Sequence, residues 1–303
     1  MTEFATTASR VTVVMITHNR RDQLDQTLTR LEPTVGDVRV IVVDNGSDDG
    51  TVEMVQTRHP GVEVIGLPDN AGAVGRNIAI ERVHTPYVAF CDDDTVWQPG
   101  SLERGVALLD AHPGLATVTG KCLVEPELAE DPITPEMRGS PLRRPEWMPG
   151  PALLGIMAGL TMIRTDAFRQ AGGFCERYWL GGEEELLALD LAAAGWHMVW
   201  DEQMVIHHRP SVRRDPTRRR QLGIRNTLWT LWLRRPAIHA LQRSWRIVAS
   251  APRDRVTLGA VAEAARSAGW VLRHRKVVPD HVEAGLRTLE HSQDHSVARQ
   301  YVG

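Results

Sequence analysis

The chain has 303 residues, of which 42% are hydrophobic and 24% are charged, and its formal net charge is −3. This composition excludes a fibrous or disordered chain and is typical of a soluble globular protein with one large α/β domain and an appendage, or with two domains. The first residues lack the basic start and apolar core of a signal peptide. The longest apolar run, 151–163, is shorter than the roughly 20 residues that span a bilayer. We therefore expect a cytoplasmic protein.

Charge is unevenly distributed along the chain. Residues 201–303 carry 19 Lys+Arg and 9 Asp+Glu, whereas residues 1–200 carry 16 and 29. A basic tail on an acidic body suggests contact with an anionic partner, such as a lipid surface, a pyrophosphate or the body itself. A solvated, arginine-rich helical surface would give the same pattern.

Apolar, β-branched runs alternate with helical patterns through the first third of the chain. Expected strands cover residues 11–16, 38–43, 62–67 and 88–91, and helical patterns follow the first three of them. Strands and helices that alternate at intervals of 20 to 30 residues predict a doubly wound, parallel sheet with helices on both faces. Ligands of such sheets bind outside the carboxyl ends of the strands.

Polar residues follow three of these expected strands. They are the stretch 17–20, then Asp44, and then the acidic triplet 92–94. All three should meet in one crevice, where Asp44 could accept hydrogen bonds from a ribose hydroxyl or a base N–H. A further helix opens within residues 70–77, where its amino terminus beside Arg76 offers a place for anionic oxygens.

The acidic triplet, Asp92, Asp93 and Asp94, directly follows an apolar strand. Three adjacent like charges are tolerated only in water or where a cation neutralises them. The pattern therefore predicts a divalent metal at the end of this strand, and a solvated acidic turn is the alternative.

The next hundred residues suggest a second half of the same domain. A helix over 102–109 and a strand over 116–123 precede residues 125–151, which contain seven prolines and which we expect to be either an acceptor-side loop or a purely structural one. A buried strand over 159–163 and a short helix capped by Asp166 should follow.

Glu183, Glu184 and Glu185 open a leucine-rich helix. Negative charge is favourable in a first helical turn, so capping alone would explain these glutamates, and a catalytic role is the other interpretation. Short strands are expected over 197–200 and 204–206, the second followed by His207 and His208. A basic helix over 213–235 and further helices should complete the chain.

In this order, the motifs resemble those of the inverting glycosyltransferases of family 2, including rhamnosyltransferase-like members. The resemblance covers about residues 9–235 and rests on VVMITHNRRDQL, VIVVDNGSDDGT, NAGAVGRNIAI, YVAFCDDDTVWQPGSL, Gly-Gly-Phe at 172–174 and GGEEELLALDLAAAGW. It implies a GT-A type α/β fold, with a mostly parallel sheet and helices on both faces, over 1–235. The nucleotide-sugar half would cover about 9–122, the acceptor half about 123–212, and a C-terminal helical extension 236–303.

The resemblance also implies roles for individual residues. Asp92 and Asp94 would be the outer members of a metal-binding Asp-x-Asp motif, with Asp94 the direct ligand of Mn²⁺ or Mg²⁺, and His208 would lie near that metal, although His207 is an equal candidate from its position. The donor would contact Thr17, Asn19, Arg20, Asp44, Asn70, Arg76, Asn77, Asp92 and Asp93.

The late helix of the family starts with Glu-Asp, whose Asp acts as general base. Counting back from 194–196 places Glu183 and Glu184 on those positions, with Glu184 as the expected base and Glu183 as the second candidate. The family often has another Asp two residues later, where this chain has Leu186.

The expected function is therefore transfer of a sugar from a nucleotide-sugar, with UDP- or dTDP-sugars favoured over GDP-sugars, to a glycan, lipid-linked or small-molecule acceptor. We expect no nucleic-acid partner, and peripheral membrane contact could come from the basic helices. One alternative is a non-catalytic nucleotide-sugar-binding protein, which Leu186 would support. A sugar nucleotidyltransferase is disfavoured because residues 17–20 lack a Gly-rich stretch for a triphosphate.

Overall fold

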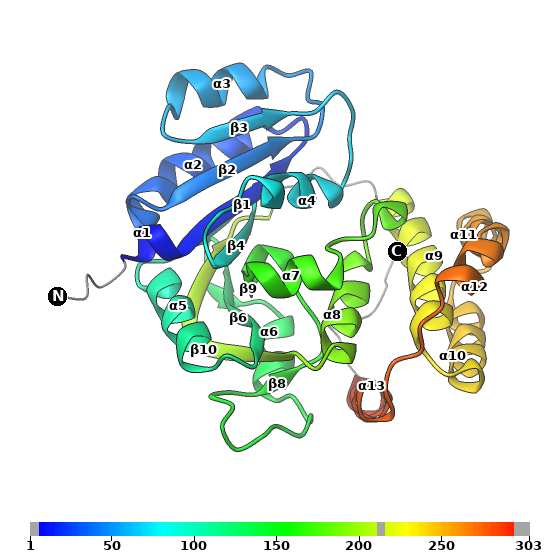
Figure 1. Ribbon diagram of the computed structural model, residues 1–303. Helices are drawn as coiled ribbons and strands as arrows, with labels where there is room; N and C mark the ends of the chain where they lie inside the picture. Colours follow the sequence, from blue (N-terminus) through cyan, green and yellow to red (C-terminus); the bar gives the residue numbers. More distant parts are fainter. Residues whose placement is uncertain (1–5, 211–215, 294–303) are drawn as a thin grey trace.

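The computed structural model of the chain describes residues 6–210 and 216–293. A ten-stranded sheet runs through its centre in the order β3-β2-β1-β4-β9-β6-β10-β5, with β7 paired to β6 and β8 paired to β10 (Figure 1). The strands are β1 (Val11–Thr17), β2 (Arg39–Asp44), β3 (Glu63–Gly66), β4 (Tyr87–Asp92), β5 (Thr95–Trp97), β6 (Leu115–Val124), β7 (Ala129–Glu130), β8 (Ala152–Leu153), β9 (Thr161–Arg164) and β10 (His197–His208).

The long strands of this sheet share one direction. Parallel pairing joins β3, β2, β1 and β4 and also joins β6 to β10, while β9 runs antiparallel between β4 and β6. This confirms the prediction of a doubly wound, mostly parallel α/β sheet. The register pairs Thr17 with Asp44 and Ile16 with Asp92, so the polar ends of β1, β2 and β4 meet at one edge.

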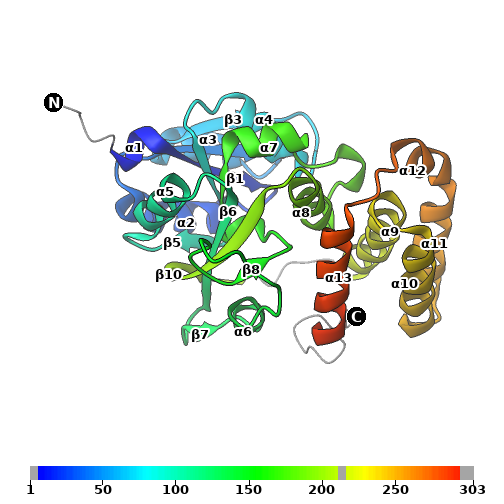
Figure 2. The same cartoon turned by 60° about the horizontal axis from the view of Figure 1, so that its bottom comes forward.

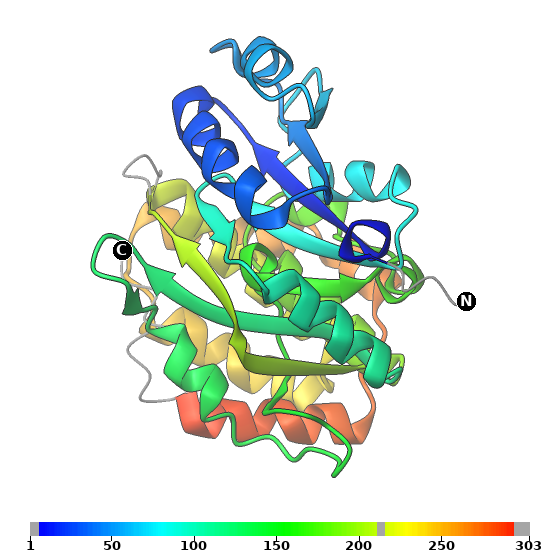
Figure 3. The same cartoon turned by 90° about the vertical axis from the view of Figure 1, so that its left-hand side faces the viewer.

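Helices cover both faces of the sheet, and each face has its own apolar cluster. Figure 3 shows the sheet from the side of α2 (Arg21–Val35) and α5 (Ser101–Ala111), which pack on one face together with α3 (Thr51–Arg58). The opposite face is covered by α4 (Val74–Glu81), α7 (Thr165–Ala171) and α8 (Glu183–Ala193). The short helices of this part are α1 (Thr7–Arg10), whose Ala8 packs on the α2 and α5 side, and α6 (Ile133–Arg138).

The last helices gather on the side of the molecule next to α8 (Figures 1 and 2). They are α9 (Pro216–Arg234), α10 (Ala237–Ser250), α11 (Arg255–Arg266), α12 (Ala268–His274) and α13 (Asp280–Gln293). Leu186 of α8 packs with Trp229 and Leu233 of α9, which anchors this group to the sheet domain. No helix in the described part of the chain is long and apolar enough to cross a membrane. The expected helical residues 213–215 and 294–303 lie outside the described ranges.

Three local expectations were wrong. β10 is one strand rather than two, because the Asp201 carboxylate accepts the N–H groups of Gln203 and Met204 and holds an irregularity within the strand. Asp166 lies in the first turn of α7 and does not cap it, since the helix begins one residue earlier. Finally, residues 125–151 contain α6 and the short strand β7 as well as irregular backbone.

Candidate active site

Two residues of the acidic triplet are buried, which rules out a solvated turn. Asp93 and Asp94 are only 7% and 3% exposed. The Thr17 hydroxyl donates to Asp93 at 2.9 Å, and the Arg20 guanidinium lies 2.7 Å from Asp93 and 3.4 Å from Asp94. Burial raises the pKa of the Asp93 carboxyl to about 6, although the charge of Arg20 opposes this change. Asp93 therefore faces β1, where the protein itself supplies its partners.

Asn19 links the loops that follow β1 and β2. Its backbone N–H donates to the Ser47 hydroxyl at 2.8 Å, and its side-chain oxygen accepts the N–H of Asp48 at 2.9 Å. The φ of Asn19 is +51°, a left-handed conformation that asparagine tolerates better than most residues. Ser47 also donates through its N–H and its hydroxyl to the buried Asp44 carboxylate. Asn19, Ser47 and Asp44 are thus joined by hydrogen bonds and form one wall of the predicted nucleoside site.

Arg76 places a buried positive charge at the end of β4. Its side chain, on α4, is 5% exposed and donates to Asp92 at 2.5 Å, and its guanidinium carbon lies about 6 Å from the ring centres of Phe90 and Phe174. The Asp92 side chain is 42% exposed, so this carboxylate is open to a ligand on the side away from Arg76.

Asn70 and Asn77 hold backbone segments together. The Asn77 amide donates to the Phe174 carbonyl at 2.8 Å, and its oxygen accepts the Phe174 N–H at 2.9 Å. The Asn70 side chain accepts the N–H of Gly72, and its carbonyl accepts the indole N–H of Trp179. A Cβ on Gly72 would lie 2.2 Å from the Trp179 carbonyl oxygen, so only glycine fits there. Both asparagines therefore have structural contacts where the sequence suggested contacts with a donor.

Glu183 and Glu184 begin α8 in a low-dielectric environment. Glu183 is 4% exposed, and one of its carboxylate oxygens has no hydrogen-bond partner among the described residues. Glu184 is partly exposed as a whole residue, but its carboxyl is buried and accepts the Ala158 N–H at 2.5 Å. Burial raises the pKa of both carboxyls, and the adjacent Glu183 charge contributes to a value of about 8 for Glu184, while Arg76 acts in the opposite direction. Such a group can exchange a proton near neutral pH.

A short backbone segment connects Glu184 to Asp92. Ala158, which holds Glu184, begins the 3₁₀ turn η1 (Ala158–Leu160). A Cβ on the next residue, Gly159, would lie 2.6 Å from an Asp92 carboxylate oxygen. The carboxylates of α8 and β4 therefore belong to a single site, and no sequence pattern pointed to residues 158 and 159.

Between the two histidines, His208 is the one that faces the acidic triplet. Its Nε2 lies 3.6 Å from an Asp94 carboxylate oxygen, whereas His207 lies 3.4 Å from Glu125. In the described part of the chain, ligand atoms of Cys122, Asp131 and His208 also lie within 4.8 Å of one another. Carboxylate oxygens are the ligands that Mn²⁺ and Mg²⁺ prefer, so Asp94, with His208 at 3.6 Å, could hold the implied metal.

The loop before α8 is held by two residues of α9. The fully buried Asn226 amide donates to the carbonyls of Tyr178, Leu180 and Gly181, at 3.0, 3.2 and 2.5 Å. Arg225 also donates to the Tyr178 carbonyl, at 3.1 Å. The first C-terminal helix therefore fixes the backbone that leads into Glu183 and Glu184, and Arg225 and Asn226 have a structural role here.

The fold is that of a glycosyltransferase. A model of the glycosyl transferase family 2 matches residues 12–170, and the chain belongs to this family. It is 30% identical over 242 residues to N-acetylglucosaminyl-diphospho-decaprenol L-rhamnosyltransferase of Mycobacterium tuberculosis, covering 67% of this chain and 78% of that protein. Undecaprenyl-phosphate mannosyltransferase of Micrococcus luteus is 32% identical over 171 residues, covering 53% of this chain and 68% of that protein.

A solved structure gives the same fold. The mannosyltransferase PcManGT from Pyrobaculum calidifontis, solved with GDP-Man and Mn²⁺, aligns with a TM-score of 0.59 and 19% identity over 96% of this chain and 82% of that chain. The predicted GT-A fold is thereby confirmed, and the protein is a glycosyltransferase.

Proposed function

We propose that the protein transfers a sugar from a nucleotide-sugar to an acceptor hydroxyl with inversion at the anomeric carbon. Glu184 removes the proton of the acceptor hydroxyl, the acceptor oxygen forms a bond to the anomeric carbon, and the bond from that carbon to the diphosphate oxygen breaks. The observation that carries this proposal is the position of Glu184, fixed by the Ala158 N–H and joined through Gly159 to Asp92 at the donor end of the sheet.

A bound Mn²⁺ or Mg²⁺ would supply the charge that neutralises the departing diphosphate. Asp94 would be its main ligand, with Asp92 and His208 as further candidates, and the Mn²⁺ in PcManGT supports the use of a divalent metal. Thr17, Arg20 and the wall formed by Asn19 and Asp44 would hold the nucleoside side of the donor.

For the donor we favour a UDP- or dTDP-sugar. For the acceptor we favour a lipid-linked molecule, because the two relatives carry decaprenol and undecaprenyl phosphate in their names. The proposal includes a glycosyltransferase domain up to residue 235 and a helical extension from 236. A sugar nucleotidyltransferase would instead release pyrophosphate from a nucleoside triphosphate, which a pyrophosphate assay detects.

The alternative function, a nucleotide-sugar-binding protein without catalytic activity, rested mainly on Leu186, and the contacts of Leu186 remove that support. Leu186, where the family often has an acid, is 5% exposed and packs against Tyr178 and Trp229. Its apolar side chain therefore serves the junction between α8 and α9, and it does not indicate a decayed site.

The test measures release of nucleoside diphosphate from UDP-, dTDP- and GDP-sugars with Mn²⁺ and lipid-linked acceptors. We expect acceptor-dependent release with one donor, and an inverted anomer in the product by NMR. Acceptor-dependent transfer with retained configuration would refute the proposed mechanism.

A further inference from the structure

Helix α10 exposes an apolar stripe to solvent. Ile238, Leu241, Trp245 and Val248 recur every three or four residues, so they share one face of the helix. Their exposed fractions are 57%, 57%, 74% and 38%. Single exposed apolar residues are common, but four on one helix face form a patch of the kind that marks an interaction surface.

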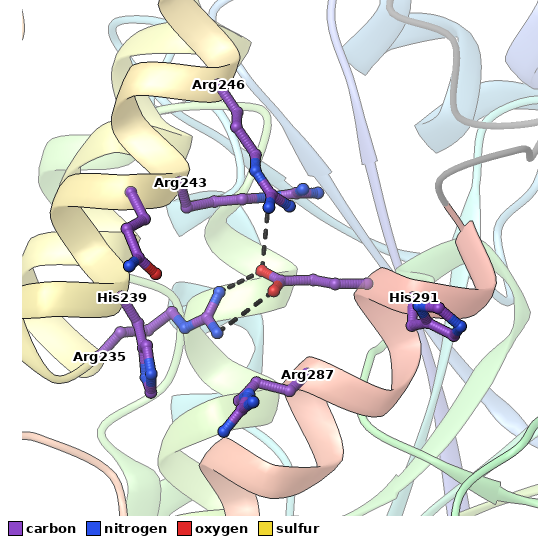
Figure 4. A pocket seen from close by; sticks show the side chains of 8 residues that line it. Arg235, His239, Arg243, Arg246, Arg287 and His291 are labelled. Atoms are coloured by element: carbon purple, nitrogen blue, oxygen red, sulfur yellow. Dashed lines mark hydrogen bonds and ion pairs between the residues drawn. The ribbon is translucent and has the colours of Figure 1, made fainter.

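A basic cleft lies beside this stripe, between α10 and α13. The cleft has a volume of about 280 Å³ and is lined by four arginines, two histidines, Gln242 and Glu290 (Figure 4). Glu290 is the one acidic residue in the lining, and its carboxylate is already paired with Arg235 and Arg243. Within residues 6–210 and 216–293, neither Arg246 nor Arg287 forms an ion pair. The cleft therefore keeps an excess of positive charge for an external anion.

The stripe and the cleft occupy adjacent sides of the same helix. Gln242 and Arg246, which line the cleft, each follow a stripe residue by one position, or about 100° around the helix. Ala240, on the side away from both, is completely buried. α10 thus presents an apolar stripe on one side and arginines on the adjacent side. Helices that lie in the interface of a bilayer have this arrangement, with tryptophan at the headgroup level and arginine near the lipid phosphates.

We propose that α10 and the adjoining cleft dock the protein on an anionic phospholipid bilayer. The apolar stripe enters the headgroup region, and Arg246 and Arg287 bind lipid phosphates. Charge complementarity favours an anionic bilayer as the partner, because residues 216–293 carry 15 Lys+Arg against 5 Asp+Glu, a net charge of +10. In this proposal, the basic tail of the sequence is the part of the protein that contacts the membrane. The inference does not require the proposed transfer reaction, since docking is measured without donor or acceptor.

The experiment is co-sedimentation of the full chain with two kinds of vesicle, one of phosphatidylcholine alone and one of phosphatidylcholine with about 30% phosphatidylglycerol. Binding to each is measured at low and at physiological salt. We expect binding to the anionic vesicles only, weakened by salt. Trp245→Ala and the double variant Arg246→Ser/Arg287→Ser should each reduce the bound fraction severalfold. Inorganic phosphate at millimolar concentration should not displace the protein, which separates a bilayer site from a simple phosphate site.

The matched control is Arg58→Ser/Arg82→Ser, which removes the same charge from exposed side chains at the C-terminal ends of α3 and α4, away from α10 (Figure 1). This control should bind like the original chain, and melting curves should show that all variants are folded. Equal binding to neutral and anionic vesicles, or equal losses in the control and the α10 variants, would overturn the proposal. A dimer that buries the apolar stripe would also overturn the proposal. Sedimentation velocity would detect such a dimer, and Trp245→Ala would dissociate it.

Discussion

The Arg76 guanidinium donates to the Asp92 carboxylate at 2.5 Å from a position that is almost completely closed to solvent. A buried cation that loses this partner would be strongly unfavourable, so the pair fixes the end of β4 relative to α4. The positive charge of Arg76 also opposes the rise in the pKa values of Glu183 and Glu184. One arginine thus connects the donor end of the site to its acid–base end.

Glu184→Gln should keep donor binding and lose transfer. The amide cannot take the acceptor proton, so kcat should fall by about 10²- to 10⁴-fold, the range of general base catalysis. Titration calorimetry measures donor binding and a transfer assay measures kcat. Glu185→Gln, which removes the same charge from the same helical turn, is the control and should keep most of the activity. Full activity of Glu184→Gln would move the base to Glu183.

The rate should increase with pH through about 8. Burial raises the pKa of Glu184 to about 8, so the carboxyl is mostly protonated at pH 6 and becomes an effective base as it ionises. With a neutral acceptor, kcat/KM of the free enzyme should rise nearly tenfold per unit below that value and then level off. A flat profile between pH 6 and 9 would contradict the assignment.

Arg76→Met should move this profile to higher pH. The substitution removes a charge that lowers the pKa of Glu184 and keeps much of the side-chain volume. The variant should therefore need a higher pH for half-maximal kcat/KM, and an unchanged midpoint would show that Arg76 does not act on the base. Arg39→Met, on β2, is the matched control for loss of an arginine.

Asn226→Ala should reduce both stability and turnover. It leaves the carbonyls of Tyr178, Leu180 and Gly181 without this donor, and an unsatisfied buried group costs about 1–3 kcal/mol. Urea unfolding measures the stability. Asn226→Asp keeps the shape but lacks the amide donor, so it should lower kcat like the alanine variant. Normal kcat in Asn226→Asp would mean that packing alone holds this loop.

The sequence predicted the parts of the site that follow local rules. Thr17, Asp44 and Asp92 were identifiable because polar residues at the ends of parallel strands meet at one edge. Leucine spacing likewise predicted the helix that begins at Glu183. The resemblance to the family indicated that Glu184 or Glu183 is the general base.

Contacts between segments distant in the chain were not predictable. The Ala158 N–H that holds Glu184 and the Trp179 carbonyl above Gly72 come from irregular backbone, where neither period 2 nor period 3.6 applies. The sequence predicts two strands in place of β10 because Asp201 interrupts the apolar pattern, whereas in the structure its side chain accepts the backbone N–H groups at that point. Asn77 was expected near the donor, yet its hydrogen bonds to Phe174 depend on a loop almost a hundred residues later.

The most direct test of the central claim is donor binding with and without metal, by thermal unfolding with a panel of UDP-, dTDP- and GDP-sugars, for the original chain and Asp94→Ala. A ligand at a hundredfold excess over Kd stabilises a protein by about 2.7 kcal/mol. We predict that Mn²⁺ enables this shift with one donor, and that EDTA or Asp94→Ala removes it. Donor-dependent stabilisation unchanged by either treatment would contradict a metal-assisted site at the end of β4.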